Sequence, residues 1–462
     1  MVIKKSLKRK FHWRWLTWPP VVSLSIIFVI YFVVSFLSLD PDFGWHLQAG
    51  NYFLAHGIPA TDIFTYTAKN FPWVDHEWLG DILLSIMYSG GGYVLLSVIY
   101  SCLWTLSAWL VGRKVHNLTL IVAVLATVPF AGVRAITWSV LGLALLIVIV
   151  NAKSRRIRWI LPLLFLVWAN FHGSFVIGFA YLLYMALKQR SWSLVGLTFV
   201  SVIATLINPY GFGLYIEVLR TLGDSSLHFR ISEWSPFFIP WMTIPYVLVW
   251  MCAFALTGLK NWRKYLGIDV LFFLAGVSSM RNLVLFIIIS LGVTDIRLRD
   301  VAKTIPKTLD KPRRRLIVIF GTAITLFIIG TMVYHFWGTS IDRESSSPKN
   351  AVSYLQKHPC EGNLFNDYNY GGYLIWKLPS EKVYIDGRMP SWVMNGHKYM
   401  DEYVGILTDS KIRKTIFKEY NIKCALVNKS NDKKSIVKGL IKDKWTTVAT
   451  DPSSLLLLSP KK

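Results

Sequence analysis

The sequence predicts an α-helical polytopic membrane protein of about 11 transmembrane helices, followed by a small soluble α/β domain at the C-terminus. Three observations lead to this fold class. Hydrophobic residues make up 53% of the 462 residues and charged residues only 16%, far from the composition of a soluble globular chain. Long apolar stretches recur as far as residue 337, where the composition turns polar. Most of the net charge of +24 lies in short basic runs between these stretches.

Eleven apolar stretches are predicted to cross the membrane. The first follows a basic N-terminus, as in a signal peptide. No small-residue cleavage pattern precedes Asp40, so this stretch is interpreted as a retained helix. The predicted crossings are residues 21–39, 93–112, 118–132, 136–150, 159–171, 174–187, 194–207, 239–259, 268–280, 283–296 and 316–337.

The basic runs all agree with one orientation. If residues 1–14 are cytoplasmic, the alternation of crossings places every later basic run in a cytoplasmic loop, as the positive-inside rule requires. The C-terminal domain is then extracytoplasmic. Next to spanning helices such runs indicate topology, so no nucleic-acid partner is expected. The runs are residues 113–114, 153–158, 188–190, 260–264 and 297–315.

Residues 79–89 are apolar but too short to span, and three glycines follow at 90–92. Counting this segment as a crossing would move Arg113 to the outside. It is therefore interpreted as an interfacial helix on the outer leaflet. The alternative is one half of a long, bent spanning helix.

The change in composition divides the chain into a transmembrane domain at 1–337, with a first outer loop at 40–92, a linker at 338–348 and a domain at 349–462. Alternating strand-like and helical runs predict an α/β sheet in the last part. Cys360 and Cys424 could form a disulfide there or remain two buried thiols. Strands are expected at 363–365, 383–385, 424–427, 446–449 and 455–458, and helices near 350–357, 397–407, 410–420 and 434–441.

The unusual polar residues all fall on the predicted outer face. Ionisable groups at a membrane boundary are costly unless they pair or line a wet cavity, so their gathering indicates a polar site. Lys69 is the only lysine or arginine of the first outer loop, so arginines of other outer turns or a bound cation must balance its acids. The candidates are Asp40, Asp42, His46, Asp75, His76, Glu77, Arg134, His172 and Arg281.

These residue types suit one kind of chemistry. A carboxylate can accept the proton of an attacking hydroxyl, and a guanidinium can hold a phosphate leaving group. Each candidate also has a structural interpretation. Residues 40–42 could cap a helix, and residues 75–77 could form a solvated turn. The two arginines could snorkel to headgroups, and His172 could make an interhelical hydrogen bond.

A set of short motifs runs through the outer loops and the C-terminal domain. They are residues 42–47, 57–59, 62–66, 76–79, 168–173, 208–211, 281–282, 365–368, 371–374 and 385–388. As a set, the motifs resemble the polytopic GT-C superfamily of glycosyltransferases that use lipid-linked sugars. The likeness is to a bacterial and archaeal branch related to the protein mannosyltransferases and the aminoarabinose transferases.

The resemblance implies transfer of a sugar, with inversion, from a polyprenyl-phosphate-linked donor to an acceptor hydroxyl at the extracytoplasmic face of a plasma membrane. The expected partners are this donor, membrane lipids and a glycan, lipid or protein acceptor. The family's catalytic base falls on Asp42, with Asp40 as the less favoured choice.

The remaining candidates take supporting roles in this resemblance. Asp42, Asp75 and Glu77 offer hard oxygen ligands, which permit Mg²⁺ or Mn²⁺ without requiring either. The other implied roles are acceptor or cation binding by Asp75, Glu77, His76 and His46, contact with the lipid phosphate by Arg281 and Arg134, and support by His172.

Three other functions compete with this hypothesis. A lipid-linked glycan flippase or transporter could use the outer polar residues as a gate, although such proteins place charges near mid-membrane and show repeated halves. A glycan ligase would move a whole glycan, and a scaffold would catalyse nothing. Replacing Asp42 by Asn should inactivate either transferase and leave a flippase or a scaffold intact.

Overall fold

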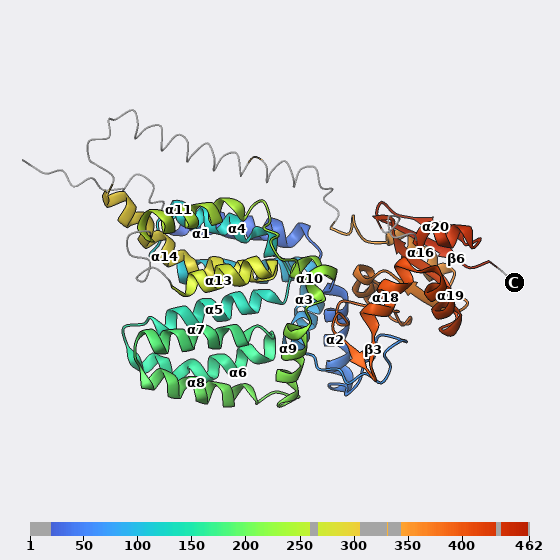
Figure 1. Cartoon of the computed structure of the whole chain (residues 1–462), viewed down its shortest axis with the longest axis horizontal. Coiled ribbons are helices and arrows are strands. Elements are labelled where there is room, and N and C mark those ends of the chain that lie inside the picture. The colour runs from blue at the N-terminus through green and yellow to red at the C-terminus, as the bar shows by residue number, and fades with distance from the viewer. Residues whose placement is uncertain (1–19, 259–266, 305–329, 331–342, 431–435, 461–462) are drawn as a thin grey trace, which may run out of the picture.

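The computed structural model describes residues 20–258, 267–304, 330, 343–430 and 436–460. They form a helix bundle and a smaller C-terminal part with a sheet, which sits at one end of the bundle (Figure 1). The mostly helical character and the small C-terminal sheet of the predicted fold class are thus confirmed. The predicted crossing at 316–337 apart from residue 330, the basic runs at 1–14 and 260–264, residues 305–315 of the last basic run, and residues 338–342 of the linker lie outside the described residues.

Each predicted apolar stretch within the described residues contains a helix. Residues 136–150, for example, form one helix over their whole length because they are mostly apolar and contain no proline. The helices are α1 (Pro20–Leu37), α3 (Trp78–Gly112), α4 (Asn117–Thr127), α5 (Ile136–Val150), α6 (Leu161–Phe171), α7 (Phe175–Lys188), α8 (Trp192–Thr205), α11 (Ile244–Gly258), α13 (Ile268–Ser278) and α14 (Leu283–Thr304).

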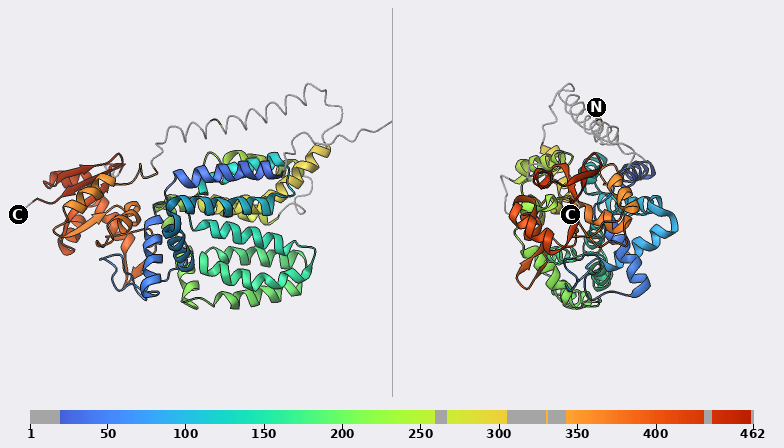
Figure 2. Two further views of the ribbon diagram at one scale, coloured as in Figure 1. Left: turned by 180° about the vertical axis from the view of Figure 1, so that it is seen from behind. Right: turned by 90° about the vertical axis from the view of Figure 1, so that its right-hand side faces the viewer.

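Among the described residues, only α3 is long and apolar enough to cross a membrane by length and composition. The number of crossings therefore stays a prediction. The break predicted in this region is confirmed, because Gly91 and Gly92 have non-helical backbone angles inside α3. A second helix, α2 (Phe43–His56), precedes it and runs across the end of the bundle (Figure 2).

Short elements join the long helices. Near the same end of the bundle as α2 lie α9 (Gly213–Gly223), α10 (Leu227–Arg230) and η4 (Ser232–Trp234), and Figure 1 shows α9 running across the direction of the bundle helices. The others are η2 (Val128–Phe130), η3 (Arg155–Ile160) and η5 (Met280–Asn282).

The C-terminal part contains a mixed four-stranded sheet in the order β1-β4-β6-β5. β1 (Asn363–Asn366) and β4 (Ile422–Asn428) are parallel, and β6 (Ser454–Leu458) pairs antiparallel with β4 and β5 (Thr446–Thr450). The predicted α/β sheet is confirmed. The helices and remaining short elements are α16 (Lys349–Lys357), η6 (Tyr368–Tyr370), α17 (Gly371–Lys377), β2 (Val393–Met394), β3 (His397–Lys398), α18 (Tyr399–Thr408), α19 (Ser410–Glu419) and α20 (Ile436–Lys442).

Two sequence expectations for this part are now decided. Cys360 and Cys424 form a disulfide, so the alternative of two thiols is wrong. Residues 383–385 are not a strand of the sheet. The Asn366 side chain instead bonds the Tyr384 N–H and the Ile385 carbonyl, and Val383 pairs with Thr65 of the first outer loop.

The first outer loop packs into the core of the C-terminal part. Apart from Phe43, its buried aromatic residues belong to the same hydrophobic cluster as the sheet, and the Phe71 and Trp392 rings stack with their centroids 4.1 Å apart. The N-terminus of α2 also meets α17 closely, because a Cβ on Gly44 would overlap the Gly372 carbonyl. These contacts hold the C-terminal part against the residues that precede α2.

Candidate functional site

A cavity of about 360 Å³ lies where the first outer loop, the outer ends of several helices and the C-terminal part meet. His172 lies just behind its wall, with Nε2 3.3 Å from Glu77 Oε1. The structure therefore brings all the predicted site residues into one region. Those that line the cavity itself are Asp40, Asp42, His46, Asp75, His76, Glu77, Arg134 and Arg281.

Asp40 and Arg134 form an ion pair at this cavity. Asp40 Oδ2 is 2.5 Å from Arg134 Nε, and Glu233 lies 3.6 Å from the same guanidinium. The other Asp40 oxygen accepts a hydrogen bond from the Asp42 backbone N–H at 2.8 Å. The Asp40 charge raises the pKa of Arg134 above its ordinary value. Asp40 is thus engaged by a cation and by the backbone.

Asp42 precedes α2, but its side chain makes no capping hydrogen bond, so the helix-cap interpretation of this residue is wrong. Its carboxylate lies against Gly387, where a Cβ would overlap Asp42 Oδ1. Burial, and then the charge of Asp40, raises the pKa of Asp42 to about 7. Asp42 is therefore a carboxyl group that gains and loses a proton near neutral pH.

Glu77 is surrounded by three histidines. Its Oε2 is 3.5 Å from His46 Nε2, and its Oε1 is 3.6 Å from His76 Nε2 and 3.3 Å from His172 Nε2. Burial raises the pKa of Glu77 to about 7, whereas the nearby His46 charge acts in the opposite direction. The segment at 75–77 is thus part of a buried polar cluster rather than a solvated turn.

A chain of hydrogen bonds orients His172 toward Glu77. His172 Nδ1 accepts a bond from the Ser174 N–H at 3.1 Å and lies 2.8 Å from Ser139 Oγ. Trp168 Nε1 donates to the same hydroxyl, whose proton is then available for His172. Burial lowers the pKa of His172 well below its ordinary value. The neutral ring therefore carries its proton on Nε2, which faces Glu77.

Two further acidic residues, Asp75 and Asp81, lie close to His46. His46 Nδ1 is 2.6 Å from Asp81 Oδ1, which fixes the ring between Asp81 and Glu77. Burial, and then the Asp81 charge, raises the pKa of Asp75 well above its ordinary value. Asp75 Oδ1 also accepts a bond from the Glu77 N–H at 2.9 Å. These carboxyl groups hold protons more tightly than exposed ones.

Arg281 differs from Arg134 in its partners. Its guanidinium stacks over the Trp234 ring, 4.7 Å from the centroid, and it takes part in no ion pair among the described residues. Its charge nevertheless lowers the pKa of His172. Arg281 is therefore a cation in the cavity lining that can bind an anion without giving up a carboxylate partner.

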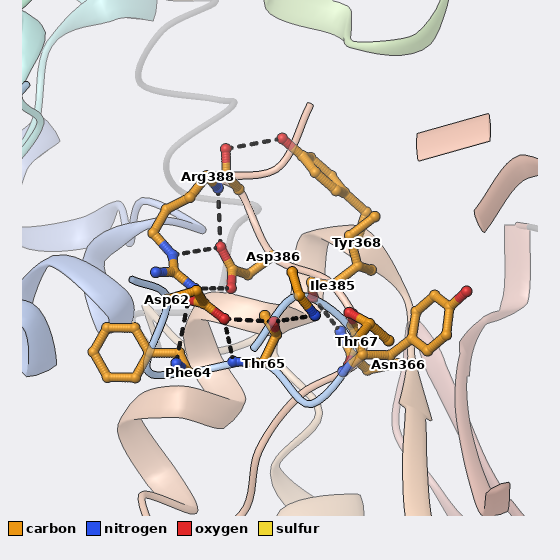
Figure 3. A network of polar contacts seen from close by, with 12 residues as sticks. Asp62, Phe64, Thr65, Thr67, Asn366, Tyr368, Ile385, Asp386 and Arg388 are labelled. Carbon is orange, nitrogen blue, oxygen red and sulfur yellow. Dashed lines mark hydrogen bonds and ion pairs between the residues drawn. The ribbon is translucent and has the colours of Figure 1, made fainter. Parts of the chain in front are cut away.

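The C-terminal part contributes the turn at 386–388. Arg388 donates to both Asp386 oxygens, at 2.8 and 2.7 Å, and is 2.8 Å from Asp62 Oδ1 of the first outer loop (Figure 3). Asp62 in turn accepts bonds from the Thr65 hydroxyl and backbone. This buried cluster holds the turn in place, with Gly387 against Asp42.

Some of these residues were not among the sequence candidates for the site. Asp81, Glu233 and Arg388 all contact a predicted residue or help to build the cavity wall. The shortage of basic residues in the first outer loop indicated only that cations from elsewhere balance its acids, and it singled out none of these three residues. The structure shows how those acids are balanced, because Asp40 pairs with Arg134 and Asp62 with Arg388.

A metal ion was permitted at Asp42, Asp75 and Glu77. Within the part of the chain that the structure describes, no group of three or more His, Cys, Asp or Glu side chains is arranged to hold one. The oxygens of Glu77 face imidazole nitrogens at 3.3 to 3.6 Å instead. The present geometry does not fit a metal ion, and the chemistry considered below uses side chains alone.

Solved structures with a similar fold are known. The apo crystal structure of the Archaeoglobus fulgidus oligosaccharyltransferase matches with a TM-score of 0.53 and 13% identity, over 88% of this chain and 69% of that one. The chain has the fold of an archaeal oligosaccharyltransferase. The same enzyme, AglB, in complex with an inhibitory peptide and a dolichol-phosphate matches with a TM-score of 0.51 and 12% identity over the same shares.

This oligosaccharyltransferase is a GT-C glycosyltransferase, so the resemblance predicted from the motifs is confirmed at the level of the fold. At identities of 12–13% the likeness extends to the fold alone. No family model and no curated protein matches the chain.

Proposed function

We propose that the chain is a membrane glycosyltransferase that moves a sugar from a polyprenyl-phosphate-linked donor to an acceptor hydroxyl on the extracytoplasmic face. The observation that supports this most is the state of Asp42. Its carboxylate lies in the cavity lining, no arginine of the described residues pairs with it, and its pKa is raised to about 7. A general base works best with such a pKa.

The proposed reaction is a single displacement. Asp42 takes the proton of the acceptor hydroxyl while that oxygen bonds to the anomeric carbon of the sugar. The bond between this carbon and the phosphate oxygen breaks, and the phosphate leaves with the electron pair toward Arg281. Attack opposite the leaving group inverts the anomeric centre. Asp75, His76 and Glu77 bind the acceptor, and His172 holds Glu77 in place.

A glycan ligase is the second candidate, and the structural comparison favours it. The matched enzyme is an oligosaccharyltransferase, and one of its structures holds a dolichol-phosphate and an inhibitory peptide. A ligase would use the same base and the same cation with a larger glycan on the lipid. The two candidates differ only in the donor that is consumed.

The test is transfer of radiolabelled sugar by purified, reconstituted protein. The donor panel contains polyprenyl-phosphate monosaccharides and a polyprenyl-diphosphate oligosaccharide, each with and without EDTA. Wild type is compared with Asp42→Asn and with Glu381→Gln, which changes an exposed carboxylate outside the cavity lining. Product from wild type and from Glu381→Gln, but not from Asp42→Asn, is expected.

The other outcomes separate the alternatives. Turnover of the oligosaccharide donor alone identifies a ligase, and loss of activity in EDTA identifies a metal requirement. Equal turnover by Asp42→Asn contradicts the assignment of the base. Lipid translocation without transfer, unchanged in Asp42→Asn, replaces the proposal with a flippase.

A further inference from the structure

The segment at 212–238, which contains α9, α10 and η4, has one polar and one apolar side. Three of its charged residues form ion pairs with other parts of the protein, and Glu217 pairs with Arg220 inside the segment. Asp224 pairs with Lys398 at 2.7 Å, Arg230 with Asp401, and Glu233 with Arg134. On the polar side, Glu217 and Thr221 of α9 and Glu233 and Trp234 of η4 also line the site cavity.

The opposite side exposes large apolar side chains. Along α9 they follow helical spacing on one face, while Leu214, Glu217 and Val218 are buried on the other. Few soluble surfaces present so many large apolar residues together. The exposed side chains are Phe212 at 70%, Ile216 at 62%, Leu219 at 65%, Leu222 at 56%, Phe229 at 88%, Phe237 at 84% and Phe238 at 56%.

The backbone at Phe237 has an unfavourable conformation. Its φ of 57° lies in the left-handed region, which bulky side chains rarely adopt. A hydrogen bond from its N–H to the Val277 carbonyl, at 2.7 Å, holds this conformation. A strained backbone thus keeps a large ring almost fully exposed, and contact with an apolar surface gives that ring a favourable environment.

Two observations favour lipid as the environment of this apolar side. The exposed apolar side of α8 includes Phe199 and Ile203, and Ile207 just after the helix is exposed as well. The chain passes from Ile207 to Phe212 through a short turn, so the two apolar surfaces are continuous along the chain. Figure 1 also shows α9 crossing the direction of the bundle helices at their end. A helix at the boundary of a bilayer lies in this direction.

We propose that residues 212–238 lie in the outer leaflet of the membrane, with the apolar side in contact with acyl chains and the polar side forming a wall of the site cavity. The cavity is then bordered by lipid on one side. This inference stands independently of the proposed function, because its test measures lipid contact and not turnover.

The first test uses the unmodified full-length protein in nanodiscs that contain a phosphatidylcholine with a diazirine in its acyl chain. After illumination, adducts are located by mass spectrometry. Adducts are expected on peptides from 212–238 and, as a positive control, from α8, but not from α19. Adducts on α8 without any on 212–238 would overturn the proposal.

The second test uses nitroxide labels at Leu219→Cys and Phe229→Cys, in a protein whose free Cys102 and Cys252 are replaced by alanine. The matched control is Ile412→Cys, an exposed apolar position on α19. The labels at 219 and 229 should be more accessible to oxygen than to a water-soluble nickel complex, and the label at 412 the reverse. Water-like values at 219, or dipolar broadening from a second copy of the chain, would refute lipid contact.

Discussion

Asp42, which is half-buried, and Asp62, which is buried, belong to the same loop, yet they have opposite surroundings. Arg388 lies 2.8 Å from Asp62, and Thr65 donates to it. Asp42 has a neighbouring carboxylate instead, Asp40, and its pKa is raised to about 7. Charge compensation, rather than residue type or position in the loop, therefore separates an acid that holds the structure together from one that can transfer protons.

The two aspartates also depend on each other through the C-terminal part. Arg388 links Asp62 to Asp386. Gly387, which lies between Asp386 and Arg388 in the sequence, packs against Asp42. The paired cluster thus holds a wall against the unpaired carboxylate. This arrangement gives the C-terminal part a direct structural role in the site, which its motifs did not reveal.

The largest expected effect comes from exchanging the two aspartates for asparagine. Asp42→Asn should lower turnover by about 10²- to 10⁴-fold, because it removes the proposed base. Asp62→Asn should instead lower the free energy of unfolding by about 2 kcal/mol, because it leaves a buried arginine with one carboxylate partner. Turnover and thermal unfolding are measured on both variants in the same detergent.

The sign of the stability change sharpens this test. Because the folded-state pKa of Asp42 is raised from 3.8 to about 7, the folded chain binds this proton more tightly than the unfolded chain. The stabilisation of the folded state by the Asp42 proton is fully present below about pH 4 and is lost as the pH rises through 7. At pH 8 Asp42→Asn should therefore unfold at the wild-type temperature or above it. Destabilisation equal to that of Asp62→Asn would show that Asp42 is structural too.

The two arginines of the cavity give the next effect. Arg281→Ala should lower kcat/KM for the lipid donor by about 10- to 100-fold, because a charge-assisted contact with phosphate is lost. Arg134→Ala should mainly lower stability, because it leaves Asp40 and Glu233 without their cation. Donor titrations and unfolding curves separate the two outcomes. Equal KM changes in both variants would contradict the assignment of the phosphate to Arg281.

Much of the fold was predictable from the sequence, because it depends on local patterns. Residues 136–150 are a mostly apolar stretch without proline, and α5 has these bounds. The glycines at 90–92 indicated the break in α3. The site residues could be grouped because one rule, the distribution of basic loops, assigned them to one side of the membrane.

The contacts across the chain were not predictable. Asp62 needed a cation, but no local pattern points to Arg388, which is brought near only when the first outer loop packs into the C-terminal core. The strand expected at 383–385 failed for a similar reason. Its backbone groups bond to the Asn366 side chain and to the first outer loop, and neither partner is adjacent in sequence.

The pH dependence of activity is the third way to test the comparison. If ionised Asp42 is the base, kcat/KM should rise about tenfold per pH unit up to about pH 7 and then level off. Asp40→Asn should move this midpoint to lower pH, because the Asp40 charge is one cause of the raised pKa. If the midpoint does not move, the rise of kcat/KM with pH is due to ionisation of Glu77, whose pKa is also about 7.

The smallest expected effects come from removing one hydroxyl on each side of the comparison. Tyr368 donates to the Gly387 carbonyl at 3.1 Å, beside Asp42, whereas Thr65 donates to Asp62 at 2.5 Å. Tyr368→Phe should lower turnover a few-fold and leave unfolding unchanged, because the turn loosens while the ion pairs stay. Thr65→Val should cost about 1 kcal/mol of stability and leave turnover unchanged. If both variants changed both quantities, the two carboxylates would form one coupled network, and the division between a structural and a reactive acid would fail.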